Sequence, residues 1–159
     1  MISPHGWFVA LAQSHLGQIM QTSQWAFAVV EMVHLVALAV VGGSVLIVDL
    51  RLMGVVLKKE SAPGIGRDLS RLLLGSLVLM VFSGIAMVSE EALKCYYSPA
   101  FRWKMVLLMT ALTFYFTFHR RALLKTGAGD PTAWSRVTAA VSITLWLGVG
   151  IAGRAIGLI

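Results

Sequence analysis

Four apolar runs, each close to or above the length that crosses a lipid bilayer, constrain this chain more than any other feature. They cover residues 25–50, 72–88, 101–118 and 139–159. A transmembrane helix needs about 20 apolar residues. The polar connections between the runs contain Pro63, Pro99 and Pro131, and prolines of this kind mark places where helices begin or end. We therefore expect an all-α integral membrane four-helix bundle, forming a single transmembrane domain over residues 1–159.

The overall composition supports a membrane environment. The chain is 58% hydrophobic and only 13% charged, with a mean hydropathy of +0.82. A soluble domain is about one quarter charged, and this chain has too few polar residues to cover its apolar surface in water. Its net charge of +6 comes from basic residues in short connections, which favours contacts with anionic membrane lipid rather than with nucleic acid. The single cysteine, Cys95, excludes an internal disulfide and a multi-cysteine metal site.

The distribution of lysine and arginine predicts the orientation. The connections after the first and third runs carry nine of the 13: Arg51, Lys58, Lys59, Arg67, Arg71, Arg120, Arg121, Lys125 and Arg136. The other four are Lys94, Arg102, Lys104 and Arg154. Cytoplasmic loops are the basic ones. We therefore expect a bacterial inner-membrane protein with both termini, and the connection after the second run, outside the cytoplasm.

Residues 3–22 differ from the four apolar runs. Their apolar members are spaced for one side of a helix: Trp7, Phe8, Leu11, Leu16, Ile19 and Met20. Serine, histidine and glutamine occupy the other side, which predicts an N-terminal amphipathic helix lying in the outer interface of the membrane. The alternative is a polar lead-in to the first span.

Ionisable residues inside a membrane are costly and tend to mark function. Counting along each helix from its basic end places four polar residues at one depth, about 24–27 Å from that end. They are His34, Ser89, Lys104 and Arg154. Glu31 and Glu90 lie beside this outer polar layer.

A second polar layer lies closer to the basic end. Asp49 follows His34 by 15 residues, and His119 follows Lys104 by the same number. The two layers are therefore about 22 Å apart, and Asp49 is level with His119. A haem held by two histidines needs both at one depth, so His34 and His119 cannot share an iron. His15, on the predicted interfacial helix, is the other candidate to approach His34.

Several sequence strings resemble an uncharacterised family of small four-helix bacterial membrane proteins. They are Glu31-Met32-Val33-His34, Gly43-Ser44, Asp49-Leu50-Arg51-Leu52-Met53-Gly54, Phe101-Arg102-Trp103-Lys104 and Trp146 with Gly153-Arg154. The resemblance covers nearly the whole chain and implies the four-helix fold.

A more distant resemblance connects the chain with HemJ-type protoporphyrinogen oxidases and CopD-type copper-resistance proteins. The shared features are an early His in a span, a glycine in mid-span and an Arg-Leu near its end, here His34, Gly43 and Arg51-Leu52. This resemblance implies haem b on His34, with Lys104 as the lysine that opens a later helix. It does not carry over the enzymatic activity, because the Pro-Arg-Leu of the oxidases is Leu50-Arg51-Leu52 here.

Three functional hypotheses follow. In the first, the chain binds haem b near the outer face and works in redox or electron-transfer chemistry with a membrane or periplasmic redox partner. His34 is then the axial ligand of the iron, Lys104 and Arg154 bind the propionates, and Glu31 orients the imidazole.

In the second hypothesis the chain is a non-enzymatic subunit or scaffold, in an oligomer or a larger complex. Its outer carboxylates pair with its outer cations, and Asp49 pairs with His119, so that the polar layers fix helix packing.

The third hypothesis is a transporter of a small solute or of copper. Soft copper ligands are present in Met32, Met87, Met105 and Cys95. Four helices without a repeat or a broken span would have to oligomerise to form such a transporter.

Overall fold

The computed structural model describes residues 4–57, 60, 62–126 and 131–156, which form helices and connecting turns with no strand among them. Three helices are long and apolar enough to cross a membrane: α3 (Gln24–Met53), α4 (Ala62–Glu90) and α8 (Ala133–Ile156). The predicted all-helical class is confirmed, and the three long apolar helices indicate a membrane protein.

A further helical segment runs alongside α8. It consists of α6 (Pro99–Phe114), the π-helical turn η1 (Tyr115–His119) and α7 (Arg120–Thr126), which follow one another without a break. A π-helical turn is rare and occurs frequently at functional sites. The predicted run 101–118 therefore ends inside η1, and helical structure continues beyond it through α7.

Local sequence signals explain where the long helices begin and end. The Ser23 side chain accepts a hydrogen bond from the Ala26 amide at 3.2 Å, which caps the start of α3. Gly54 ends this helix in the left-handed conformation with a φ of 77°, which glycine adopts without strain. The next helix, α4, begins ten residues before the predicted run 72–88, because Ile65 and Leu69 pack on the core and extend it.

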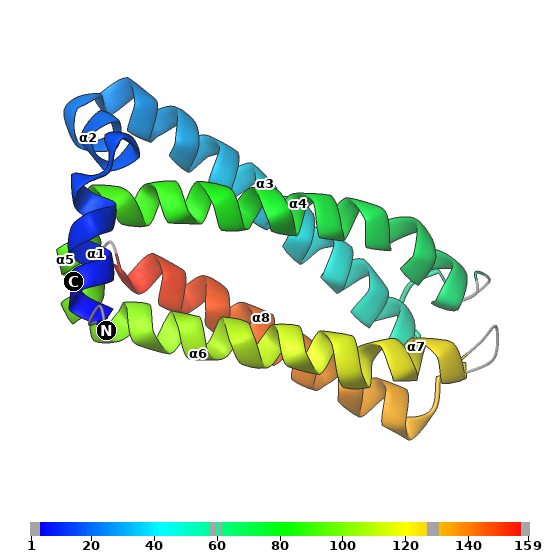
Figure 1. The fold of residues 1–159 in the computed structure, drawn as a ribbon. Coiled ribbons are helices and arrows are strands. Elements are labelled where there is room, and N and C mark those ends of the chain that lie inside the picture. Colours follow the sequence, from blue (N-terminus) through cyan, green and yellow to red (C-terminus); the bar gives the residue numbers. More distant parts are fainter. Residues whose placement is uncertain (1–3, 58–59, 61, 127–130, 157–159) are drawn as a thin grey trace.

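The N-terminal segment forms two helices, α1 (Pro4–Gln13) and α2 (His15–Thr22), rather than the single predicted helix over residues 3–22. Residue 3 lies outside the described part. The break is at Ser14, whose side chain accepts a hydrogen bond from the Gly17 amide at 3.1 Å and caps α2. Figure 1 shows both helices lying across one end of the long helices. There α1 packs on the short helix α5 (Ala92–Tyr97), and α2 packs on α4.

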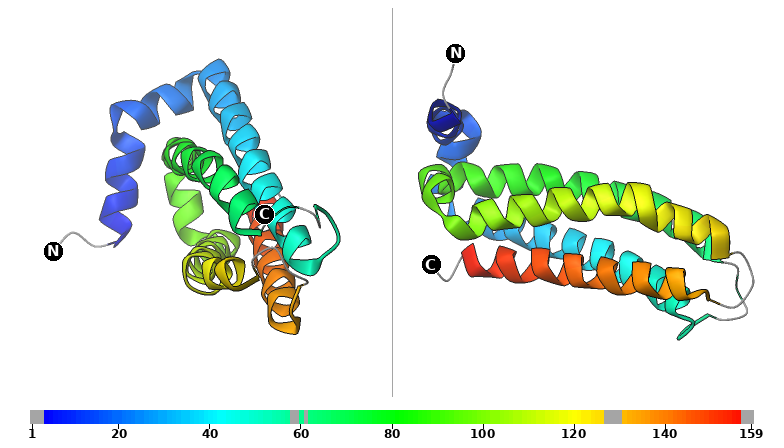
Figure 2. Two further views of the ribbon diagram at one scale, coloured as in Figure 1. Left: turned by 90° about the vertical axis from the view of Figure 1, so that its right-hand side faces the viewer. Right: turned by 90° about the horizontal axis from the view of Figure 1, so that it is seen from below.

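The long helices pack in two pairs, α3 with α4 and α6 with α8, and α3 also contacts α8 (Figures 1 and 2). At the α7 end α4 contacts α7 as well, so the two pairs converge there. One buried apolar cluster lies at this end and comprises Val48, Leu52, Ala62, Ala122, Leu123 and Ala139. A second buried cluster contains Val45, Leu73 and Tyr115, packed against Trp146. It lies about one helical turn farther from the α7 end than the first cluster. The apolar core is therefore concentrated in the half of the bundle near α7.

Candidate functional site

His34 lies on α3 with one ring nitrogen against α4. Its Nδ1 is 2.9 Å from the Oγ of Ser83. The Ser83 hydroxyl donates its own hydrogen to the Leu79 carbonyl at 2.7 Å. With its single hydrogen in that bond, the Ser83 hydroxyl offers lone pairs to Nδ1 of His34, which favours the tautomer that carries its proton on Nδ1. In that tautomer Nε2 keeps the lone pair with which histidine binds a metal.

Two glycines make room for the side chains of the outer layer. A Cβ atom on Gly84 would lie 3.3 Å from Cε1 and 3.8 Å from Nδ1 of His34, so the ring rests against the backbone of α4. A Cβ atom on Gly153 would lie 3.5 Å from Cε and 3.6 Å from Nζ of Lys104. The ammonium group of Lys104 therefore reaches across from α6 to the backbone of α8.

Lys104 is half-buried and has no carboxylate partner among the described residues. The ion pairs formed in that part of the chain are Lys94–Glu91, at 3.2 Å, and the histidine–aspartate pair of the second layer. Lys104 lies close enough to His34 and to Cys95 for their charges to interact. The outer layer thus contains an imidazole and an unneutralised cation near each other.

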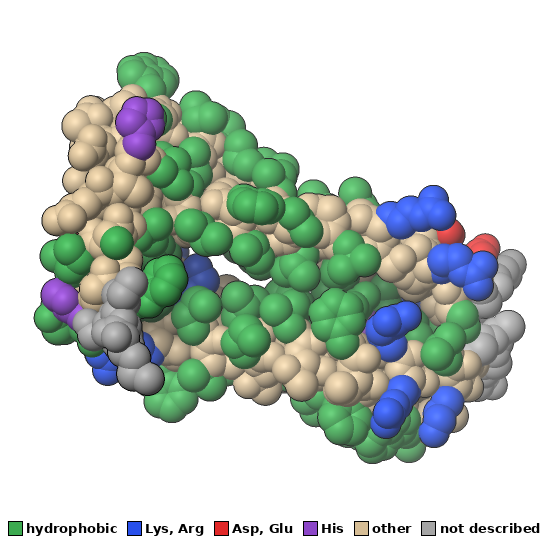
Figure 3. All heavy atoms as spheres, viewed as in Figure 1, with side chains coloured by type: hydrophobic (Ala, Val, Ile, Leu, Met, Phe, Trp, Pro, Cys, Tyr) green, Lys and Arg blue, Asp and Glu red, His purple; other side chains and the backbone are tan. Residues whose placement is uncertain are grey.

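The surface of the bundle is hollowed at this end. Figure 3 shows an opening between α4 and α6, toward the α1 and α5 end, with a lysine or arginine side chain visible inside it. The pairing of the helices explains the opening. α4 packs mainly against α3, and α6 packs mainly against α8, so α4 and α6 do not pack closely against each other. We use the name outer hollow for the group of residues His34, Ser83, Gly84, Lys104 and Gly153, which the contacts above place on α3, α4, α6 and α8.

The other residues of the predicted outer site take different positions. Arg154 is exposed on α8, directly after the glycine that faces Lys104. Glu31 is half-buried and interacts with Glu90, which is a carboxylate like itself. Neither acid forms an ion pair with Lys104 or Arg154 among the described residues. His15 is exposed on α2, whereas His34 is half-buried on α3.

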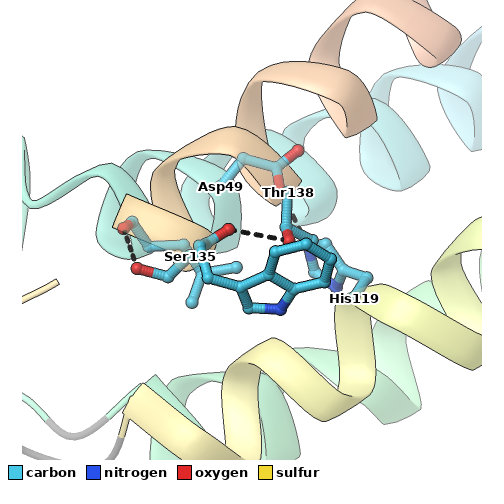
Figure 4. A network of polar contacts seen from close by, with 6 residues as sticks. Asp49, His119, Ser135 and Thr138 are labelled. Atoms are coloured by element: carbon cyan, nitrogen blue, oxygen red, sulfur yellow. Dashed lines mark hydrogen bonds and ion pairs between the residues drawn. The ribbon is translucent and has the colours of Figure 1, made fainter. Parts of the chain in front are cut away.

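The second layer forms a tight pair. Nε2 of His119, the last residue of η1, lies 2.7 Å from Oδ1 of Asp49 on α3, and both side chains are 0% exposed. The ring of Tyr115 stacks on His119 with centroids 4.9 Å apart and planes 25° apart. Figure 4 shows the pair together with Ser135 and Thr138 of α8. This arrangement ties α3, η1 and α8 together at one level.

Reasoning from the sequence missed several polar residues of these sites. The hydroxyl of Ser83 is the partner of His34, and the serine before Gly84 in mid-span was its only signal. Ser135, Thr138 and Ser142 form a buried stripe on α8, which their spacing of three and four residues could have revealed. Arg51, counted above as a topology signal, is 1% exposed, and its Nε donates to the Glu60 carbonyl at 2.8 Å.

The ligand set limits what the outer hollow can bind. Within the described ranges, no three or more His, Cys, Asp and Glu side chains gather so that they could hold a metal ion. A bare transition-metal ion is bound by several protein side chains. A haem iron receives four ligands from its macrocycle and needs only one or two from the protein. A single imidazole next to a cation therefore fits haem better than a bare ion.

Comparison with known proteins adds a family and no activity. No curated protein and no solved structure matches the chain. A family model, described as a family of unknown function, matches residues 7–159 and so covers nearly the whole chain. The chain therefore belongs to this family, DUF6644.

Proposed function

We propose that the chain binds haem b in the outer hollow and serves in redox or electron-transfer chemistry. The observation that carries the proposal is the contact between Nδ1 of His34 and the Ser83 hydroxyl at 2.9 Å, which favours a proton on Nδ1 and a lone pair on Nε2. The nearby cation without a carboxylate partner supports it, because haem carries two propionates. When bound, haem b supplies reversible one-electron transfer.

Each residue of the hollow has a separate task in this proposal. His34 would ligate the iron, and Ser83 would hold its ring in place and raise its basicity through the Nδ1 hydrogen bond. Lys104 would bind a propionate by a charge-assisted hydrogen bond. Arg154, exposed on the same stretch of α8, would meet an anionic group at the edge of the hollow. The likeness to HemJ-type and CopD-type proteins is part of this proposal.

The proposal includes a position in the membrane. The continuous segment of α6, η1 and α7 would cross as the fourth span, completing a four-helix membrane bundle. Lysine and arginine side chains gather at the α7 end (Figure 3), which would face the cytoplasm of a bacterial inner membrane. The outer hollow would then lie near the outer face, where a membrane or periplasmic redox partner can exchange electrons with it. The helices α1 and α2 would lie in the outer interface.

A membrane scaffold is the second candidate function. The buried pair of Asp49 and His119 favours it, because this bond joins α3 to η1 without a ligand. Buried pairs of this kind fix helix register. The outer layer does not favour a scaffold, since Lys104 lacks a carboxylate partner among the described residues.

A visible absorption spectrum of the purified protein, oxidised and then reduced with dithionite, tests the haem proposal. The protein should be expressed with ample haem. We expect a Soret band and α and β bands that sharpen on reduction. His34→Ala should abolish all of them, while His15→Ala, at an exposed histidine, should keep them. Ser83→Ala should weaken haem binding by about 10–100-fold.

Size-exclusion chromatography of each variant checks that it is folded. A wild-type spectrum without a Soret band would overturn the haem proposal and favour the scaffold. The same holds if His34→Ala and His15→Ala bind haem equally well.

A further inference from the structure

The buried pair of the second layer holds two polar atoms without a partner. Oδ1 of Asp49 and Nε2 of His119 bond to each other, but Oδ2 of Asp49 and Nδ1 of His119 have no hydrogen bond within the described part of the chain. Both side chains are fully buried. An unpaired polar atom at such a place costs about 1–3 kcal/mol.

No arrangement of protons within the pair removes this cost. If the ring is an imidazolium, the Nδ1 proton has no acceptor, and Oδ2 has no donor. If the ring is neutral with its proton on Nε2, the lone pairs of Nδ1 and Oδ2 both lack a donor. If Asp49 is protonated and donates to Nε2, the proton on Nδ1 again lacks an acceptor. Each state therefore leaves a place where a water molecule or a proton can bind.

A stripe of buried hydroxyls lies between the pair and one end of the bundle. Ser135, Thr138 and Ser142 follow one face of α8 and are 1%, 2% and 2% exposed. Ser142 lies close enough to Asp49 for the two side chains to interact. Ser135 lies near the start of α8, where its hydroxyl approaches the Leu52 carbonyl at 3.1 Å. The stripe therefore extends from Asp49 toward the end where the lysine and arginine side chains gather (Figures 3 and 4).

On the side that faces away from the α7 end, the surroundings of the Asp49–His119 pair are apolar. The cluster of Val45, Leu73, Tyr115 and Trp146 packs one turn farther along the helices, between the pair and the outer hollow. Protons cross a packed apolar layer poorly because it offers no hydrogen-bonding groups. A buried apolar cluster that includes Leu52 also lies on the α7 side, but there the Ser135 hydroxyl donates to the Leu52 carbonyl at 3.1 Å. Buried hydroxyls thus accompany the apolar side chains on the α7 side, which favours exchange with that end.

We propose that the Asp49–His119 pair is a proton-binding site, loaded from the α7 end along the hydroxyls of α8. A proton leaves a hydronium ion or a buffer acid at that end and forms an N–H bond at Nδ1 of His119 or an O–H bond at Oδ2 of Asp49. On release the same bond breaks, and the proton returns by the same route. Because both side chains are 0% exposed, a ligand larger than water would have to displace packed side chains.

Few other charges act on this site. Among the described residues, Tyr115 of η1 stacks on His119 and interacts with Arg120 of α7, and the buried Arg51 follows Asp49 by two residues on α3. The described charged residues in the first turns of α4 are exposed, namely Arg67, Asp68 and Arg71. The inward stripe of α8 offers hydroxyls and no charge. A proton added to the pair therefore changes the charge of a site with few neighbours that could compensate.

Nitrogen-15 NMR of the histidine rings tests the proposal on the whole wild-type protein in nanodiscs. The chain has four histidines, so their signals can be assigned one by one. The two ring-nitrogen shifts are far apart in a neutral imidazole and converge in an imidazolium. We expect the His119 shifts to change in this way as the pH is varied over the range in which the fold persists. Shifts that stay constant would overturn the proposal.

The route is tested by hydrogen exchange of the His119 ring in two matched variants. Thr138 and Thr144 lie on the same helix, and each donates to the carbonyl four residues before it at 2.9 Å. Thr138 is buried beside the pair and Thr144 is exposed. We expect Thr138→Val to slow the exchange several-fold and Thr144→Val to leave it unchanged. Equal rates in both variants would overturn the proposed route, and the pH titration of the wild type does not depend on either variant folding.

Discussion

Replacing His119 by alanine should destabilise the folded bundle by about 3–5 kcal/mol, because a fully buried carboxylate loses its only strong donor. The structure makes the Asp49 side chain 0% exposed with its bonded oxygen 2.7 Å from the ring, so bulk water does not solvate the carboxylate that loses its partner. Asp49→Asn keeps the size of the side chain and an oxygen that accepts from the ring. Asp49→Asn should therefore lower the free energy of unfolding by only about 1–2 kcal/mol, which is the extra strength that a negative charge gives to a hydrogen bond.

The double variant separates the pair from its surroundings. Once the carboxylate is an amide, removal of the imidazole no longer leaves a charge unpaired. The combined loss should therefore be smaller than the sum of the two single losses by about 1–3 kcal/mol.

The assay is reversible unfolding in mixed micelles with increasing SDS, followed by the fluorescence of the five tryptophans. His15→Ala, at an exposed histidine, is the control and should change the free energy of unfolding by less than about 0.5 kcal/mol. If the two single losses add to within about 0.5 kcal/mol in the double variant, the direct bond between Asp49 and His119 is refuted.

Two further predictions concern the outer end. Gly75→Ala should stabilise the bundle by up to about 1 kcal/mol, because its new Cβ meets nothing within 4 Å. Gly84→Ala should not give this stabilisation, because its new Cβ would lie only 3.3 Å from Cε1 of His34. Equal free energies of unfolding for the two variants in SDS titrations would contradict this prediction. Burial and the nearby Glu91 raise the pKa of the Cys95 thiol, so maleimide should label it slowly at neutral pH and faster at alkaline pH. Glu91→Gln should increase the neutral-pH labelling rate, and an unchanged pH profile would refute this electrostatic effect.

The sequence predicted the helical class and the long apolar helices because hydropathy and length act locally. It did not predict the start of α4, since residues 62–71 are mixed in polarity and are helical only because one face packs on the core. Ser14 was not recognised as a break, although serine often caps a helix. Capping depends on how the preceding chain enters the helix, and in this chain the packing of α1 on α5 determines that direction.

The candidate sites were predictable in depth, and the pairing of Asp49 with His119 was predicted too, but the partners of the outer layer were not. Counting at about 1.5 Å per residue places Asp49 level with His119, and the structure brings these two side chains together. The same count assumes regular helices. The π-helical turn η1 inserts a residue into the helix and turns everything after it by about 100°. The direction of His119 relative to Lys104 therefore cannot be obtained by counting.

The sequence by itself determined that the chain is helical, apolar enough for a membrane and polar at two levels, because these properties depend on composition and on position along one helix. Only the tertiary structure decided that His34 bonds to Ser83 rather than to an acid, and that Lys104 reaches the backbone at Gly153. It also decided that Arg51 is buried. Such contacts depend on the rotation of each helix about its own axis and on the small residues that allow a neighbouring side chain to approach the backbone. Both are fixed only when the helices pack against one another.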